Sequence, residues 1–113
     1  MNLKPQLKQV LAIKGVRSAA LIDGDGLLVE GVANDDTDLS FIGSAIAGSL
    51  ASSKALAGLL GEGKLTQTMI EYEEGPVLLS PLEADGREFV MALRLDGPAD
   101  LGRVRFQLRR LLP

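Results

Sequence analysis

Residues 38–60 read DLSFIGSAIAGSLASSKALAGLL, and this stretch decides our interpretation of the fold. It is typical of one long helix, in which the only charged residues are Asp38 at the start and Lys54. At about 100° per residue, one side of this helix forms an apolar stripe wide enough to cover a sheet. The stripe, predicted to belong to the core, consists of Leu39, Ile42, Ile46, Leu50, Ala57 and Leu60.

The opposite side of the same helix carries small residues where a monomer would normally place charges. These residues are Ser40, Gly43, Ser44, Ala47, Gly48, Ala51, Ser52 and Ala55. Small residues four positions apart let a second helix approach closely, so this side is predicted to bind another protein, first of all a second copy of the chain. The alternative is burial within the same domain, although one sheet and two short helices can hardly cover both sides of a long helix.

Composition narrows the possible functions. A chain of 113 residues fits one domain, which we place over residues 1–113. It has no Cys and no His, so disulfides, thiolate zinc sites and the commonest general base are excluded. The net charge of −3 argues against nucleic acid as a partner. We therefore predict a binding protein rather than an enzyme, with no catalytic residue, no metal and no cofactor.

The sequence also bears on location. Lys4, Lys8 and Lys14 interrupt the start of the chain, which lacks the continuous apolar core of a signal peptide. Residues 38–60 are too rich in Ser, Gly and Ala, and too interrupted by Lys54, to span a membrane. We expect a cytoplasmic protein without membrane insertion.

The remaining elements follow from apolar spacing and turn residues. They are a short first helix ending at Gly15, strands over 16–22, 27–32, 65–72, 77–82 and 89–95, and a last helix opened by Gly97-Pro98. Residues 65–72 alternate with mixed faces, as a strand at a sheet edge does. The order indicates an α+β domain with one mainly antiparallel, five-stranded sheet.

Residues 20–27, ALIDGDGL, form a strand and turn after the short first helix. Together with the element order, the length and the small-residue helix, this segment resembles the roadblock/LC7 domain family over nearly the whole chain. Within that family it is most similar to bacterial MglB-like proteins, which bind the small GTPase MglA. The resemblance implies an α-β-β-α-β-β-β-α order, with the long second helix on one sheet face and the terminal helices on the other.

The resemblance also implies a dimer, in which the second helices lie side by side and the third strands pair edge to edge. Such domains act as platforms for small Ras-like GTPases or as subunits of larger scaffolds. We expect a dimeric bacterial signalling module that binds an MglA-like GTPase, with its effect on GTP hydrolysis left open. The alternatives are a scaffold subunit with no nucleotide-linked activity and a small-molecule sensor, which the scarcity of aromatic and polar groups disfavours.

Two sets of site residues follow from this hypothesis. Self-association is predicted to use Gly43, Ala47, Gly48, Ala51 and Ala55 of the helix, with Thr66, Thr68 and Ile70 of the edge strand. Contact with the GTPase is predicted for Ser44, Ser52 and Lys54.

A nucleotide-binding motif is only partly present. Residues 58–64, GLLGEGK, match the first seven positions of a Walker A loop, but Leu65 follows where Mg²⁺ needs a hydroxyl. The segment also leads from a helix to a strand, the reverse of the order that binds phosphate at a helix N-terminus. We interpret it as a helix end.

Three polar clusters have ordinary interpretations. Residues 23–26, DGDG, resemble the opening of a calcium loop but lack its spacing, which favours a hairpin turn. Residues 34–38, NDDTD, are predicted to cap the long helix. A last cluster could dock an acidic partner, but its side chains do not converge on a helical projection and favour a solvated helix face; it consists of Arg103, Arg105, Arg109 and Arg110.

Overall fold

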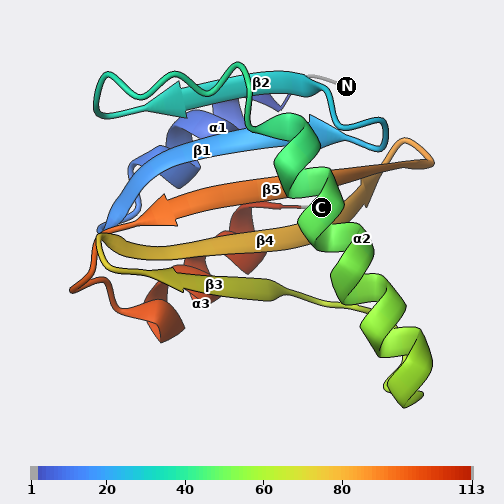
Figure 1. Ribbon diagram of the computed structural model, residues 1–113. Coiled ribbons are helices and arrows are strands. Elements are labelled where there is room, and N and C mark those ends of the chain that lie inside the picture. The colour runs from blue at the N-terminus through green and yellow to red at the C-terminus, as the bar shows by residue number, and fades with distance from the viewer. Residues whose placement is uncertain (1–2, 113) are drawn as a thin grey trace.

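The computed structural model describes residues 3–112 (Figure 1). Its elements are α1 (Lys4–Leu11), β1 (Val16–Asp23), β2 (Leu28–Ala33), α2 (Gly43–Leu60), β3 (Thr68–Tyr72), β4 (Gly75–Ala84), β5 (Arg87–Leu95) and α3 (Leu101–Leu111). This is the α+β order that the sequence predicts, with α2 on one face of the sheet and α1 and α3 on the other.

The five strands form one antiparallel sheet in the order β2-β1-β5-β4-β3. The strands β1 and β5 lie at its centre, where Ala20 faces Ala92 and Leu21 faces Met91. Successive side chains point to opposite faces, so Leu21 and Met91 face α1 and α3, whereas Ala20 and Ala92 face α2. The strands β2 and β3 are the two edges of the sheet.

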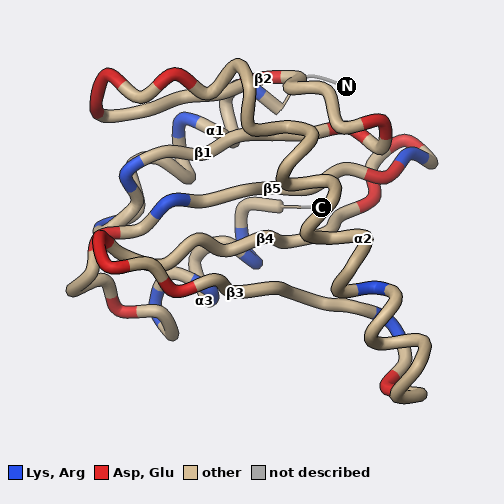
Figure 2. Tube along the Cα trace, in the orientation of Figure 1, with Lys and Arg blue, Asp and Glu red and all other residues tan. Residues whose placement is uncertain are grey.

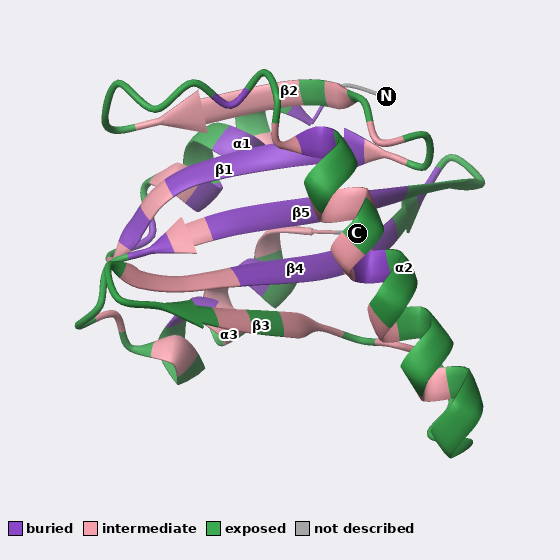
Figure 3. Ribbon diagram, in the orientation of Figure 1, coloured by how far each residue is buried: buried purple, intermediate pink, exposed green. Residues whose placement is uncertain are grey.

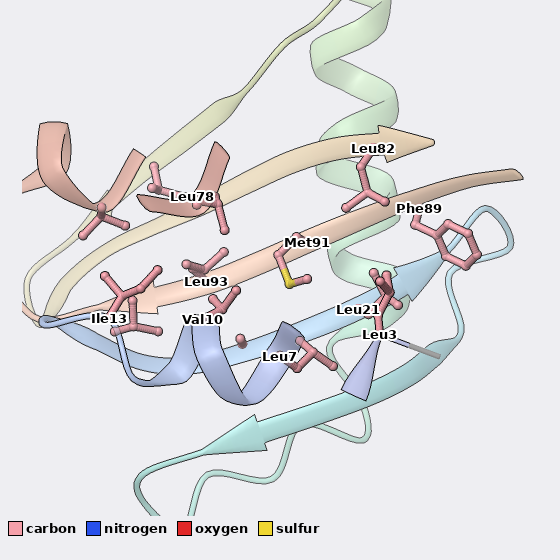
Figure 4. Close-up of a cluster of buried hydrophobic side chains, with 14 of the residues drawn as sticks. Leu3, Leu7, Val10, Ile13, Leu21, Leu78, Leu82, Phe89, Met91 and Leu93 are labelled. Carbon is pink, nitrogen blue, oxygen red and sulfur yellow. The ribbon is translucent and has the colours of Figure 1, made fainter. Parts of the chain in front are cut away.

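The larger part of the core lies between the sheet and the terminal helices (Figure 4). Leu7 and Val10 of α1 and Val104 and Leu108 of α3 are almost fully buried there. Both helices place apolar residues three or four positions apart on one side, which is why each can bury a stripe against the sheet. The strand residues in this cluster include Leu21, Leu78, Met91, Leu93 and Leu95.

A smaller core lies under α2. Leu50 is the central contact of the helix, with Ile42 and Ile46 packed partly against the same cluster. The sheet contributes mostly small or branched side chains at this face, namely Ala20, Ile22, Leu79, Val90 and Ala92. Figure 1 shows that α2 crosses the sheet towards one end of the strands and that its C-terminal half extends past β3.

The start of α2 differs from the prediction. The helix begins at Gly43 rather than Asp38, and residues 34–38 do not cap it. Instead, the Asp35 carboxylate accepts a hydrogen bond from the Thr37 amide at 3.1 Å, and Asp38 accepts one from Ser40 at 2.9 Å. Such local bonds hold the backbone in turns and compete with helix formation.

The other boundaries deviate less. The helix α2 ends before Gly61, as predicted, because Gly61 adopts the left-handed conformation with φ of 67°. The strand β3 starts at Thr68 rather than residue 65, although Leu65 still packs against the smaller core. The helix α3 starts after Asp100, whose carboxylate accepts the Arg103 amide at 3.1 Å, and not at Gly97-Pro98. Over the described residues, no helix is long and apolar enough to cross a membrane.

Candidate interaction face on helix α2

The helix α2 is poorly buried for its length. Of its 18 residues, only Gly43 and Leu50 are buried, and the C-terminal half is exposed on most sides (Figure 3). A helix that packs on one sheet face normally presents charges to water on its other side. Here the single charged residue within the helix is Lys54. An uncharged and exposed helix surface of this kind is a candidate protein-binding site.

We define the outer face of α2 as a set of exposed residues directed away from Leu50, together with Phe41, which lies just before the helix. They are Phe41, Ser44, Gly48, Ala51, Ser52, Ala55 and Leu59. Large apolar side chains stand at its two ends, because Phe41 is 84% exposed and Leu59 is 85% exposed. The residues between them are all small, which leaves a shallow middle that a second helix could approach closely.

The predicted helix contacts do not all lie on this outer face. Gly48, Ala51 and Ala55 do, and a Cβ added to Gly48 would meet no atom within 4 Å. Gly43 packs inside the subunit, where an added Cβ would collide with the carbonyl oxygen of Gly26. Ala47 lies beside the same turn residue. The structure therefore assigns Gly43 and Ala47 to contacts between α2 and the β1–β2 turn.

Sequence reasoning missed the apolar ends of the outer face. Phe41 lies seven positions before Gly48, and Leu59 lies eleven positions after it, so helical spacing predicts one side for all three, although α2 itself begins at Gly43. That spacing was the available signal. Leu60 was predicted in the core stripe, but it is 62% exposed because α2 extends beyond the sheet. Leu56 is 55% exposed for the same reason.

The C-terminal half of α2 extends past the sheet edge that is formed by strand β3 (Figure 1). Within the described residues β3 pairs with β4 alone, so the backbone groups along its outer edge have no strand partner. Thr68 and Ile70 lie in this strand, whereas Thr66 precedes it. An open edge is a template for pairing with another chain.

The three predicted GTPase contacts are not brought together. Ser44 and Ser52 lie on the outer face of α2, whereas Lys54 leans towards β5. Its ammonium nitrogen lies 3.8 Å from a carboxylate oxygen of Glu88. This pair crosses a groove of about 820 Å³ between α2 and the β4–β5 hairpin. The groove is lined by apolar residues including Ala47, Leu50, Ala51, Leu65 and Phe89.

The loop that leads into α2 is fastened to the sheet by charge. Both carboxylate oxygens of Asp35 accept hydrogen bonds from Arg94, at 3.4 and 3.3 Å, and Arg17 lies 3.6 Å away. The hydrogen bond from Thr37 and those from Arg94 hold the pKa of Asp35 well below its ordinary value. Hydrogen bonding by Ser40 likewise lowers the pKa of Asp38. These contacts fix the position from which the helix starts.

The Walker-like segment and the DGDG turn have the ordinary roles that we inferred. Gly61 ends α2, so the Walker-like segment is a helix terminus. The Asp23 carboxylate accepts the amides of Asp25 and Leu27, at 2.9 and 3.0 Å, and so closes a hairpin turn. Within residues 3–112, no group of three or more acidic, His or Cys side chains could hold a metal ion.

Comparison with known protein families is consistent with this geometry. The model of the Roadblock/LC7 domain matches residues 4–93. The chain belongs to the roadblock/LC7 domain family. Domains of this family are generally non-catalytic adaptors. Two relatives from Methanocaldococcus jannaschii, the uncharacterized proteins MJ0310 and MJ1340, are each 26% identical over 97 residues, covering 86% of this chain and 82% of theirs. These relatives are archaeal, so the bacterial origin that we expected stays a prediction.

Solved structures of the family share the fold. The gliding protein MglB from Thermus thermophilus matches with a TM-score of 0.80 and 25% identity, over 95% of this chain and 80% of that one. A structure described as MglB with tetrameric arrangement matches with a TM-score of 0.81 and 24% identity, over 95% of this chain and 79% of that one. A roadblock/LC7 domain from Streptomyces avermitilis matches with a TM-score of 0.83 and 17% identity, over 98% of this chain and 92% of that one. The resemblance to roadblock domains and to MglB proteins is thus confirmed, together with the fold class.

Proposed function

We propose that this chain is a dimeric interaction module that binds a small Ras-like GTPase of the MglA type. The observation that carries the first half of the proposal is the position of α2 relative to β3. The C-terminal half of α2, in which Lys54 is the single charged residue, projects past the same sheet edge at which β3, within the described residues, has no strand partner on its outer side. A second copy that pairs with β3 would therefore lie directly beneath the projecting helix.

The two ends of the outer face support a two-fold arrangement. In an isologous dimer, residue i of one subunit contacts residue j of the other, and the reverse contact is also made. Two antiparallel α2 helices that cross near Ala51 would set Phe41 of each against Leu59 of its partner. The small residues between these anchors permit the close approach, and the exposed apolar ends would be removed from water.

Oligomeric state in solution tests this arrangement. Ala51→Arg places a charged, bulky side chain in the middle of the proposed helix contact and is expected to yield a monomer. Ala12→Arg is a matched control, because Ala12 is also exposed but lies at the end of α1 on the opposite sheet face. Light scattering should give a monomer mass for the first variant and a dimer mass for the second. A dimer mass for Ala51→Arg would contradict the proposed contact.

The GTPase partner rests on the resemblance to MglB, since such domains serve as platforms for small Ras-like GTPases. Paired α2 helices would present Ser44 and Ser52 of both subunits next to each other. Binding should depend on the nucleotide state of the GTPase, because its switch segments change conformation when the γ-phosphate is lost. Lys54 would contribute only if it left its contact with Glu88.

Co-elution with an MglA-type GTPase tests the second half of the proposal. The complex is expected with the GTPase loaded with a non-hydrolysable GTP analogue and not with GDP, and Ser52→Glu should weaken it. Equal binding in both states, or none, would contradict the proposal and favour a scaffold subunit without nucleotide-linked activity. The dimer mass, measured separately, distinguishes loss of the partner site from loss of the dimer.

A further inference from the structure

Charge is unevenly distributed along the chain. All 15 Asp and Glu residues lie between residues 23 and 100, whereas eight of the 12 Lys and Arg residues lie in 1–22 and 101–113. The fold then brings the two basic segments together, because α1 and α3 share one face of the sheet (Figure 2). An acidic protein therefore carries a basic surface on the face opposite α2.

A groove of about 530 Å³ runs between α1 and α3 within this basic surface. Lys14 borders it from the loop that follows α1, and Arg103 and Arg110 border it from α3. Two amide side chains, Gln9 and Gln107, lie among these cations, and the apolar lining consists of Ala12, Ile13 and Leu111. Below, this site is called the α1–α3 groove.

The cations of the α1–α3 groove form no ion pair among the described residues, although the Arg110 guanidinium lies over the Phe106 ring. Lys14, Arg103 and Arg110 are exposed, and over residues 3–112 no carboxylate oxygen lies within 4.0 Å of their charged nitrogens. Arg105, by contrast, donates to Gln67 at 2.6 Å, and Arg17 is paired with Asp35 and Asp96. The groove thus keeps three positive charges available for a ligand.

A lipid surface fits these observations poorly. Helices that lie on membranes bury an apolar side in the lipid, but the apolar sides of α1 and α3 are already buried against the sheet. Phe106 is the single large exposed apolar residue that the structure describes on these two helices, and the Arg110 guanidinium lies 5.9 Å from its ring centroid. Nucleic acid is disfavoured by the acidic character of the rest of the molecule.

We propose that the α1–α3 groove binds an acidic, extended segment of a partner polypeptide. Its carboxylates would pair with Lys14, Arg103 and Arg110, and its backbone amides would hydrogen-bond with Gln9 and Gln107. This site lies on the opposite face of the sheet from the α2 contacts, so it is independent of the dimer and of the GTPase.

Fluorescence anisotropy with a labelled oligo-glutamate peptide of about ten residues tests the proposal, because such a peptide carries the required charge without other chemistry. We expect saturable binding that weakens as NaCl is raised from about 50 to about 500 mM. Reversing three charges in the variant Lys14→Glu/Arg103→Glu/Arg110→Glu should reduce the affinity at least about tenfold. Its unchanged circular dichroism and dimer mass would show that the fold and the α2 contacts are intact.

Arg109→Glu is the matched control for a local site. Arg109 is exposed on the same helix but does not line the groove, so its reversal should change the affinity less than about threefold. If Arg109→Glu and Arg110→Glu reduced the affinity for the peptide equally, binding would be due to the overall positive charge and not to the α1–α3 groove, which would overturn the proposal. Binding to vesicles with phosphatidylserine or to an oligonucleotide, with no binding of the glutamate peptide, would overturn the choice of partner.

Discussion

The two faces of the sheet are covered in different ways. Helix α1 has only eight residues, yet it buries Leu7 and Val10 completely. Helix α2 has 18 residues and buries only Gly43 and Leu50. The α1 and α3 face is complete within one subunit, since its helices turn apolar residues inward and charges outward. The α2 face is only half covered, and its outer side carries no charge.

This difference separates folding from association. Burial against the sheet explains why α1 and α3 form, because apolar area removed from water stabilises the subunit. The helix α2 is longer and more exposed than is required to pack Leu50 and its neighbours against the smaller core. We infer that the residues on the outer face of α2 serve contacts between molecules rather than the stability of one subunit. Four predictions test this contrast, in order of decreasing expected effect.

The first compares a leucine from each face. Leu7→Ala should reduce the free energy of unfolding by about 3 kcal/mol, because it leaves a cavity in the larger core. Leu59→Ala should change it by less than about 0.5 kcal/mol in the isolated subunit, because the Leu59 side chain is exposed. Urea denaturation at low protein concentration measures both values. Similar losses for the two variants would show that α2 is more tightly packed than its exposure indicates.

The second prediction concerns the inner side of α2. Gly43→Ala should destabilise the subunit by roughly 1 to 3 kcal/mol, because the new methyl group would collide with the carbonyl oxygen of Gly26 and force the helix away from the turn. Thermal unfolding followed by circular dichroism measures the change. A neutral or stabilising effect would mean that α2 is not held against the β1–β2 turn.

The third prediction concerns the outer face of α2, where the same kind of substitution should stabilise the isolated subunit. Gly48→Ala should raise the free energy of unfolding of the isolated subunit by about 0.5 to 1 kcal/mol, because alanine favours the helix and an added Cβ meets no atom there. The same change should weaken self-association if helices approach closely at this point. Urea unfolding at several protein concentrations separates the two effects. Destabilisation at the lowest concentration would contradict an open outer face.

The fourth and smallest effect concerns the charged contacts that hold the loop before α2. The pKa of Asp35 is lower in the folded protein than its ordinary value of 3.8, so its contribution to stability is present above that value. The contribution is lost as the pH falls from 3.8 towards the folded pKa, because the protonated carboxyl no longer accepts from Thr37 and Arg94 with full charge. In Asp35→Asn, the free energy of unfolding should therefore fall less steeply than in the wild type as the pH is lowered below 3.8.

Asp36→Asn is the control for this measurement, since Asp36 is exposed and makes no ion pair within residues 3–112. Between about pH 2 and about pH 6, the urea midpoint of the control should change with pH as steeply as that of the wild type. An unchanged slope in Asp35→Asn would mean that the contacts with Arg94 do not persist in solution.

Much of the architecture could be predicted because its signals are local. The spacing of Leu7 and Val10, the DGDG turn and the glycine that ends α2 each specify a conformation through neighbouring residues. The start of α2 could not be predicted in the same way. Asp38 resembles a helix cap in sequence, but it forms a turn with Ser40, because Leu39 is drawn into the core beside Gly31.

The predicted helix contacts occupy different positions in the structure. Gly48, Ala51 and Ala55 are exposed as expected, whereas Gly43 contacts the β1–β2 turn and Phe41 and Leu59 complete the outer face. A helical projection gives the angles between side chains but not the direction in which the sheet lies. The assignment of dimer and GTPase contacts stays a prediction for Thr66, Thr68, Ile70 and the residues of α2.

The sequence by itself determined the order of the elements, the apolar sides of the three helices and the lack of charge on α2, because these depend on residue type and spacing along the chain. Only the tertiary structure decided that α2 projects past the open edge of β3 and that Lys14 and two arginines of α3 lie beside one groove. Both results depend on contacts between residues far apart in the chain, and the strand order sets those contacts. The pattern of neighbouring residues in the sequence does not specify which edge of the sheet a helix extends past.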